Sequence, residues 1–244
     1  SYMNLDRYQE AITIFKNLVD KKSSIYAQPS EFFIARCYLN TKEYELAKGV
    51  LNRLLDKIKN EDIESEINYE LGQCYKFSGD YVIAEQYFEK NISRKDIKGT
   101  ESRLALADVY IRSQRYDDAE RMIKDILNNG NSNSSIRSKA KLLLFAIKYN
   151  KKDFVSALSI ATEINEKDIS KSEKFFLYNN VSKIYLRNND FDNAIKYLNL
   201  LSENLSLPEE KFAVETQKLN IMLFKDETEK IVRHVEYLSN QYVK

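Results

Sequence analysis

The fold of this chain is decided by one stretch, which reads Leu71-Gly-Gln-Cys-Tyr-Lys-Phe-Ser-Gly-Asp-Tyr-Val-Ile-Ala84. It holds two aromatic residues six positions apart, Tyr75 and Tyr81, and a small residue, Ala84, follows the second by three positions. The pattern of an aromatic residue and an alanine three positions later recurs at Tyr8/Ala11, Tyr44/Ala47, Tyr81/Ala84, Tyr116/Ala119, Phe154/Ala157 and Phe191/Ala194. Successive copies lie 35 to 38 residues apart, and such a period predicts an array of stacked structural repeats.

Each repeat is long enough for two antiparallel helices of about 13 to 15 residues joined by short turns. The first aromatic of the pair recurs at Tyr2, Tyr38, Tyr75, Tyr110 and Tyr185, with Tyr149 one place out of register in the remaining copy. Polar turn-forming residues, such as Ser78-Gly-Asp80, separate the two aromatics. Small residues precede the first aromatic by three positions, at Ala35, Gly72, Ala107, Ala146 and Ser182. We expect the two helices of a pair to cross closely at these small residues and at the alanines that follow the second aromatic.

The repeat resembles the tetratricopeptide repeat family in its helix-turn-helix pattern, in Leu71, Gly72 and Tyr75, and in the later Ala84 and Phe88. The resemblance covers nearly the whole chain, although the period exceeds the usual 34 residues and the sequence has no Trp. Sel1-like repeats also have longer periods, but they would be expected to contain more than the five glycines of this chain. The resemblance implies an all-α fold, an α-α superhelix of antiparallel helix pairs with about six and a half repeats.

Because a solenoid has one continuous core, residues 1–244 are expected to form a single domain. Tyr2, Tyr8 and Ala11 match the end of a first helix and the start of a second, so the chain is expected to begin mid-repeat and to be a fragment of a longer protein. The polar stretch 128–135 predicts a mobile loop, interpreted as a slightly long turn between repeats or as a hinge. Frequent Lys, Asn and Ile favour a bacterial source, and the compartment stays open between cytoplasm and periplasm.

Composition argues against two classes of partner. The formal net charge is +1, which lacks the basic excess typical of proteins that bind nucleic acid. No apolar run approaches the roughly 20 residues needed to cross a bilayer. Neither nucleic acid nor direct membrane insertion is therefore expected for this segment.

Motifs for catalysis, cofactor binding and metal binding are absent from the sequence. It contains no phosphate-binding glycine loop, no nucleophile elbow and no paired-histidine zinc motif. The single histidine, His234, lies among the apolar residues Ile231, Val235 and Leu238 and is interpreted as structural. The sequence therefore predicts neither an enzyme nor a cofactor.

Several residues are expected in the core or at helix ends. Cys37 and Cys74 hold equivalent positions on neighbouring first helices, too far apart for a disulfide, and are expected to be free, buried thiols. The core is expected to contain the side chains of Phe33, Ile34 and Tyr38 from one first helix. Two capping boxes are predicted to open helices, Ser170 with Glu173 and Ser206 with Glu209, the second with Pro208 between its members.

A second face of each first helix is not needed for packing within the pair. At 100° per residue, Leu71 and Tyr75 share one face of their helix, whereas Tyr69, Gln73 and Lys76 share another. The resemblance implies that this second face lines the concave inside of the superhelix and binds a partner. Carried from repeat to repeat, the predicted partner-binding face comprises Phe32, Arg36, Leu39, Tyr69, Gln73, Lys76, Leu104, Asp108, Ile111, Asn179, Lys183, Leu186, Thr216 and Asn220. The fifth repeat is ambiguous by one residue and contributes none. The alternative to partner binding is that the charged members of this face, such as Arg36, are merely hydrated.

The leading hypothesis is a non-catalytic scaffold or adaptor that binds a peptide or partner helix in the concave face, within a multiprotein assembly. The family's clamp for chaperone C-termini uses a Lys and Asn set where this sequence has Phe32 and Arg36, so those termini are not expected. Two alternatives stay open: the peptide-sensing part of a regulator with an upstream effector domain, and a self-associating structural component of a bacterial envelope complex. The expected partners are therefore proteins or peptides, with self-association possible.

Overall fold

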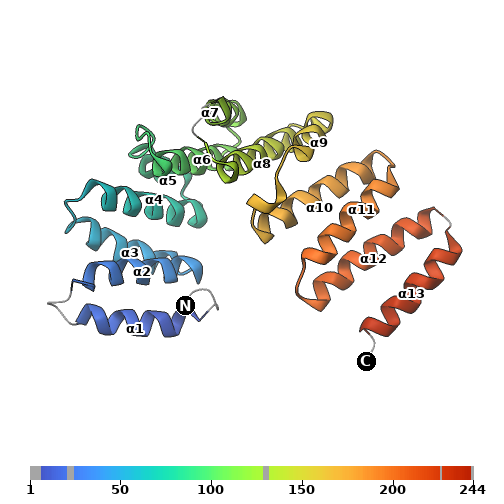
Figure 1. Cartoon of the computed structure of the whole chain (residues 1–244), viewed down its shortest axis with the longest axis horizontal. Helices are drawn as coiled ribbons and strands as arrows, with labels where there is room; N and C mark the ends of the chain where they lie inside the picture. The colour runs from blue at the N-terminus through green and yellow to red at the C-terminus, as the bar shows by residue number, and fades with distance from the viewer. Residues whose placement is uncertain (1–6, 21–24, 129–131, 226, 243–244) are drawn as a thin grey trace. The chain divides into compact units, whose positions relative to one another are not determined.

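The structure is a computed structural model that describes residues 7–20, 25–128, 132–225 and 227–242. Within these residues it consists of 13 α-helices and one short 3-10 helix, without any β-strand (Figure 1). The predicted all-α fold is confirmed. Tyr2, which was predicted to lie at the end of a first helix, falls outside the described residues.

The helices group into two compact units, residues 1–132 (unit 1) and 133–244 (unit 2). Unit 1 holds α1 (Tyr8–Asp20), α2 (Ala27–Asn40), α3 (Tyr44–Leu55), α4 (Glu61–Ser78), α5 (Tyr81–Glu89), α6 (Ile97–Arg112) and α7 (Tyr116–Asn128). Unit 2 holds α8 (Ser134–Asn150), α9 (Phe154–Thr162), the 3-10 helix (Glu166–Asp168), α10 (Lys171–Arg187), α11 (Phe191–Asn204), α12 (Pro208–Phe224) and α13 (Thr228–Tyr242). A single domain over residues 1–244 stays a prediction.

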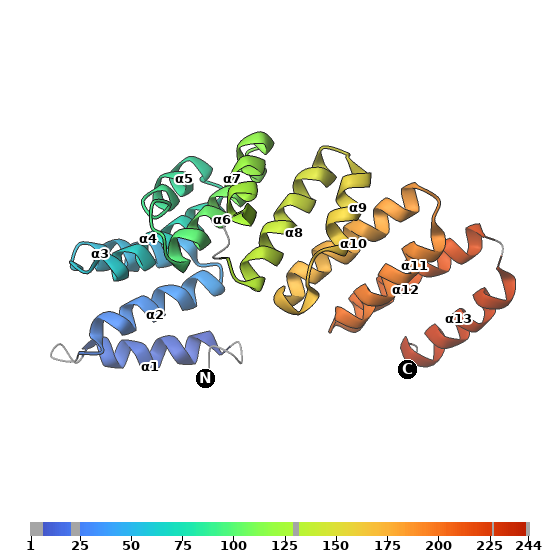
Figure 2. The ribbon, with the colours of Figure 1, turned by 45° about the horizontal axis from the view of Figure 1, so that its top comes forward.

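Consecutive helices pack as antiparallel pairs. The described helices form six pairs, α2 with α3 and so on to α12 with α13, and α1 is the second helix of a further repeat. This agrees with the expected six and a half repeats. In unit 1 the first helices α2, α4 and α6 also contact one another in that order, and they lie side by side in Figures 1 and 2.

The turn inside each pair has the same backbone conformation in five repeats. One residue there has a positive φ, and these residues are Lys42 (65°), Gly79 (90°), Gln114 (60°), Lys152 (61°) and Asn189 (57°). The next residue donates its N–H to a carbonyl five positions back, as Asp80 does to Tyr75 at 2.9 Å. A left-handed residue followed by this bond is how many helices satisfy their last carbonyls. The six-residue spacing of the aromatics therefore reflects a helix end of fixed geometry.

The same bond resolves the register of the fifth repeat. Asp153 donates to the carbonyl of Lys148 at 2.9 Å, so Lys148 occupies the place that Tyr75 has in the third repeat. Tyr149 is thus one place out of register, as the sequence indicates. The positions that correspond to Tyr69 and Gln73 are then Leu142 and Ala146, which are 6% and 8% exposed.

Small residues allow the two helices of a pair to approach closely. The alanines after the second aromatic are buried in every copy, from Ala11 at 4% exposure to Ala194 at 0%. A Cβ atom placed on Gly72 would lie 2.6 Å from the ring of Phe88, which is itself fully buried. Gly72 therefore marks the crossing of α4 and α5, as predicted.

The core contains the two cysteines as expected. Cys37 and Cys74 are free and buried, and burial raises the pKa of Cys74 to about 12. Ile34 is buried as well, but the prediction that Phe33 lies in the core is wrong, because its side chain is 37% exposed. Successive helical residues point 100° apart, so Ile34 occupies the core face while Phe33 lies at its edge and stacks on Phe15.

One of the two predicted capping boxes is confirmed. The Ser170 hydroxyl accepts from the Glu173 backbone N–H, and the Glu173 carboxylate accepts from the Ser170 N–H at 2.7 Å. The second prediction is wrong: α12 begins at Pro208, its N-cap is Leu207, and no side chain caps it. Because Pro208 occupies the first helical position, Ser206 lies one residue too early to cap the helix.

The polar stretch 128–135 is partly helical. Helix α7 ends at Asn128, and α8 begins at Ser134 with Asn133 as its N-cap. Ser134 and Ser135 therefore belong to a helix rather than to the predicted loop. Residues 129–131 lie outside the described part of the chain, and the boundary between the two units falls in this stretch.

Candidate functional site

In unit 1 the predicted partner-binding residues lie on the adjacent helices α2, α4 and α6, and we call this surface the first-helix face. It is defined by Phe32, Arg36, Leu39, Tyr69, Gln73, Lys76, Leu104, Asp108 and Ile111. Arg36 is exposed, six members are half-buried, and Lys76 and Leu104 are buried at 7% and 8% exposure. The last two can therefore shape this surface, but they offer little area to a partner.

Ion pairs join neighbouring first helices across this face. The Arg36 guanidinium lies 3.3 Å from the Glu70 carboxylate, linking α2 to α4. The Lys76 ammonium lies 3.0 Å from the Asp108 carboxylate, linking α4 to α6. Burial raises the pKa of Glu70, and the nearby Arg36 opposes that shift. Arg36 and Asp108 thus each have an oppositely charged partner on a neighbouring first helix.

The aromatic member Tyr69 is held on two sides. Gln73 donates its side-chain N–H to the Tyr69 hydroxyl oxygen at 2.7 Å, and the Lys98 ammonium lies 4.4 Å from the ring centroid. Burial raises the pKa of Tyr69 to about 12, so the phenol is neutral at physiological pH. A fixed, neutral aromatic side chain suits a binding surface, because little conformational entropy is lost when a partner packs against it.

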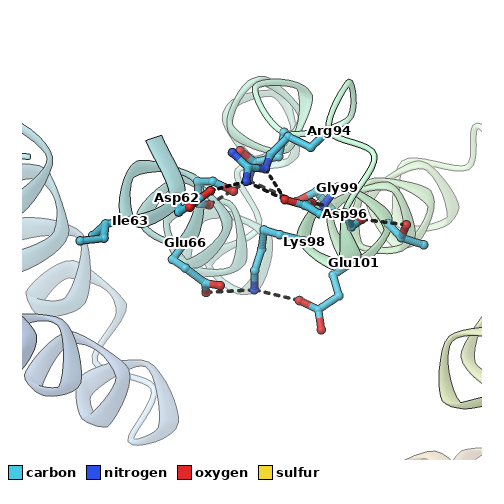
Figure 3. A network of polar contacts seen from close by, with 12 residues as sticks. Asp62, Ile63, Glu66, Arg94, Asp96, Lys98, Gly99 and Glu101 are labelled. Atoms are coloured by element: carbon cyan, nitrogen blue, oxygen red, sulfur yellow. Dashed lines mark hydrogen bonds and ion pairs between the residues drawn. The ribbon is translucent and has the colours of Figure 1, made fainter. Parts of the chain in front are cut away.

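A polar network lies between the N-terminal halves of α4 and α6 (Figure 3). The Lys98 ammonium bridges the carboxylates of Glu66 and Glu101 at 2.9 and 2.8 Å. The Arg94 guanidinium bridges Asp62 and Asp96 in the same way, at 2.5 and 2.6 Å. Burial alone would lower the pKa of Lys98, but its hydrogen bonds to Glu101 and Glu66 outweigh burial and raise it. We call the four carboxylates Asp62, Glu66, Asp96 and Glu101 the acidic ledge.

An apolar pocket of about 530 Å³ adjoins this ledge, between α2, the end of α3 and the start of α4. It is lined by Ile25, Gln28, Pro29, Phe32, Phe33, Leu54, Ile58, Asp62, Ile63 and Glu66. Seven of these ten residues are apolar, and the two charged ones are both acidic and belong to the ledge. The pocket therefore unites Phe32 of the first-helix face with two ledge carboxylates in one concavity.

Comparison with known proteins agrees with this architecture. The tetratricopeptide repeat family matches residues 65–96 and 177–203, one segment in each unit. Over these two segments the chain is similar to tetratricopeptide repeats. BtubC (BKLC) from P. vanneervenii is similar in structure, with a TM-score of 0.63 at 13% identity over 81% of this chain and 90% of that one. A tetratricopeptide repeat protein from Parabacteroides merdae ATCC 43184 has a TM-score of 0.61 at 14% identity over 100% of this chain and 90% of that one. Among curated proteins none matches the sequence.

The first matched segment covers most of α4 and all of α5, and the second covers most of α10 and of α11. The first segment includes the ledge residues Glu66 and Asp96, whereas Asp62 and Glu101 lie a few residues outside it.

In unit 2 the remaining predicted residues lie on α10 and α12. Lys183 and Asn220 are exposed, whereas Asn179, Leu186 and Thr216 are half-buried. The Asn179 carbonyl accepts from the Ser182 hydroxyl at 2.9 Å. Binding by these residues stays a prediction, as it does for the members in unit 1.

The last repeat contains a buried polar cluster around Glu215. Its carboxylate accepts from the Ser202 hydroxyl at 2.8 Å and from the Lys218 ammonium at 2.6 Å. The ring of His234 lies 3.1 Å from the Glu215 carbonyl oxygen and 3.4 Å from its carboxylate. Ser202 and His234 both contact Glu215, whereas a nucleophilic triad has its base bonded to the hydroxyl. The cluster therefore links α11, α12 and α13 through Glu215.

The described residues also bear on metal sites and on membrane-spanning helices. No group of three or more His, Cys, Asp or Glu side chains within them could hold a metal ion. No helix in the same residues combines the length and the apolar character needed to span a membrane.

The acidic ledge and most of the pocket were not predicted from the sequence. The ion pairs carry a signal that could have revealed them, because opposite charges recur at 32 residues in Asp62/Arg94, Glu66/Lys98 and Lys76/Asp108. This spacing is three residues, or about one helical turn, shorter than the 35 residues that separate Tyr81 from Tyr116. The pocket residues Ile25 and Ile58 lie outside the repeat signature and had no comparable signal.

Proposed function

We propose that this chain is a non-catalytic scaffold that binds a peptide or partner helix along the first-helix face, within a larger protein assembly. The observation that carries the proposal is the combination, on α2, α4 and α6, of ordered polar and aromatic side chains with an apolar pocket at one end. Apolar anchors that fill pockets supply most binding energy, and surrounding polar groups set register and orientation.

Preorganisation supports the same conclusion. Arg36, Tyr69 and Asp108 each have a partner on a neighbouring helix or on their own helix in the absence of any ligand. A surface whose side chains are already fixed loses less entropy on binding, and so retains more of its contact energy as affinity. The face is therefore suited to a defined partner geometry.

Site-specific photo-crosslinking in cells of the native source tests the proposal. A photoreactive amino acid is placed at Arg36 or Lys183 on first helices, and at Val82 or Val155 on second helices as matched controls. The two control side chains are 72% and 84% exposed, so accessibility does not favour the first-helix positions. We expect discrete crosslinked proteins from Arg36 or Lys183 and none of the same adducts from the controls. Identical adducts from all positions, or none from the first helices, would refute the proposal.

A further inference from the structure

We propose that the apolar pocket and the acidic ledge together bind a protein segment in which a bulky apolar side chain is followed closely by Lys or Arg. This inference deepens the proposed function and rests on it, because it names the chemistry of the partner for the same face of unit 1. It adds two features that the repeat pattern does not contain, namely the pocket beside Phe32 and the excess of carboxylates on α4 and α6.

The pocket supplies the apolar half of the recognition. Its volume of about 530 Å³ lies within the range of about 300 to 1,000 Å³ that is usual for binding sites, and it can accept a whole aromatic or branched side chain. Several lining side chains are open to solvent, with Ile25 at 82%, Ile63 at 43% and Phe33 at 37% exposure. Covering these side chains removes apolar surface from water, which favours an apolar anchor over a polar one.

The ledge supplies the charged half. Its four carboxylates share only two cations, Arg94 and Lys98, so these six groups carry a net charge of −2 (Figure 3). The neighbouring Arg103 contacts backbone oxygens of Ile92 and Arg94 with its guanidinium, and not the ledge. Between Glu61 and Glu70, α4 has five acidic residues and no basic one. The ledge is therefore complementary to added positive charge.

The two halves are adjacent in both sequence and space. Ile63 lines the pocket, the preceding residue Asp62 belongs to the ledge, and Glu66 follows about one helical turn later on α4. Figure 3 shows Ile63 pointing away from the polar network while Asp62 and Glu66 point into it. A segment anchored in the pocket would thus present its next residues to carboxylates. An acidic segment would face like charge at the same place, which gives the site selectivity.

Display selection on the whole chain tests this chemistry. The probe is a phage library of random 12-residue peptides, panned in parallel on the wild type and three variants. Ile63→Ser alters the exposed wall of the pocket. The double variant Asp62→Asn with Glu66→Gln cancels the excess charge of the ledge. The control, Glu61→Gln with Glu64→Gln, makes the same charge change in exposed residues of the same helix that do not line the pocket.

We expect enriched peptides to combine a bulky apolar residue with Lys or Arg within a few positions. The most enriched peptides are then synthesised, and their affinity is measured by fluorescence anisotropy. Their affinity for the ledge variant should be about threefold to tenfold lower than for the wild type, since two partly exposed charges are lost. The same peptides should bind the control variant with the affinity that they have for the wild type. Added salt should lower their affinity for the wild type more than their affinity for the ledge variant.

The other outcomes separate this inference from the proposed function. If the enriched peptides were acidic or uncharged but bound more weakly to Ile63→Ser, the charge assignment would be overturned and the proposed function would stand. Peptides that bound all variants with equal affinity would overturn the assignment of this pocket. Failure to enrich any peptide would count against both. Concentration-dependent dimers in light scattering that Ile63→Ser abolishes would show a second copy in the pocket, and that would overturn the inference as well.

Discussion

Replacing Gly72 by alanine tests the close crossing of α4 and α5 that the whole repeat depends on. The added Cβ would lie 2.6 to 2.8 Å from three atoms of the Phe88 ring, closer than real Cβ atoms come to other atoms. Phe88 is fully buried, so its ring cannot swing into solvent. Gly49 in α3 is the matched control, because its added Cβ would meet only the Arg53 side chain at 3.8 Å.

The two substitutions share one favourable effect and differ in one unfavourable effect. Alanine in place of glycine inside a helix stabilises by about 1 kcal/mol, and this gain applies to both positions. Overpacking a filled core costs about 1 to 3 kcal/mol, and this cost applies only to Gly72. Gly49→Ala should therefore stabilise the protein by about 1 kcal/mol, whereas Gly72→Ala should fall about 1 to 3 kcal/mol below it.

Urea unfolding of the whole chain, followed by far-ultraviolet circular dichroism, measures both variants. A double-mutant cycle adds a check, since Phe88→Leu makes room for the new methyl group and should cost less in the Gly72→Ala background than in the wild type. If Gly72→Ala proved as stable as Gly49→Ala, or if the two changes in the cycle were additive, the crossing described here would be refuted.

Three further predictions concern single contacts. Asp108→Asn leaves the buried Lys76 ammonium without its counter-ion and should lower the free energy of unfolding by about 3 kcal/mol. Lys76→Met should lower it clearly less, because Asp108 keeps a second cation, Arg112. Equal losses for the two variants in urea unfolding would contradict this asymmetry. Because burial raises the pKa of Cys74 to about 12, its thiol should react with Ellman's reagent only in unfolded protein, and rapid reaction of the native chain near pH 8 would argue against its burial. Ser170→Ala should lower the free energy of unfolding by about 1 kcal/mol and Ser206→Ala by almost nothing, since only Ser170 caps a helix; thermal melts of both variants decide it.

The repeat architecture could be predicted because it is imposed locally and many times. The spacing of Tyr75 and Tyr81 follows from one helix end and one left-handed turn, and the same turn recurs with Lys42 or Asn189 in place of Gly79. Small residues at the crossing, such as Gly72, are required wherever two helix axes approach closely. Each of these requirements acts within one repeat, so each leaves a periodic trace in the sequence.

The rest of the site depends on contacts between repeats, and those leave weaker traces. Arg94 lies in the turn between α5 and α6, and its pairing with Asp62 depends on how far one first helix is staggered against the next. The exposure of Phe33 depends on neighbouring repeats, because its ring stacks on Phe15 of α1 and lines a pocket together with Ile63 of α4. Ser206 shows a similar limit at a helix end, where a proline two positions away decided the boundary.

The ion pairs between first helices make the repeats of unit 1 non-interchangeable. Arg36 meets Glu70, but the residue at the equivalent place on α6 is Ala105, and Lys76 meets Asp108, whose equivalent on α4 is Gln73. Excising the repeat formed by α4 and α5 would place α2 next to α6. The side chains brought together in this way could not form the same ion pairs. The repeats share one backbone geometry, but each pair of neighbouring first helices in unit 1 has its own ion pair. The repeats therefore cannot be reordered without losing these contacts.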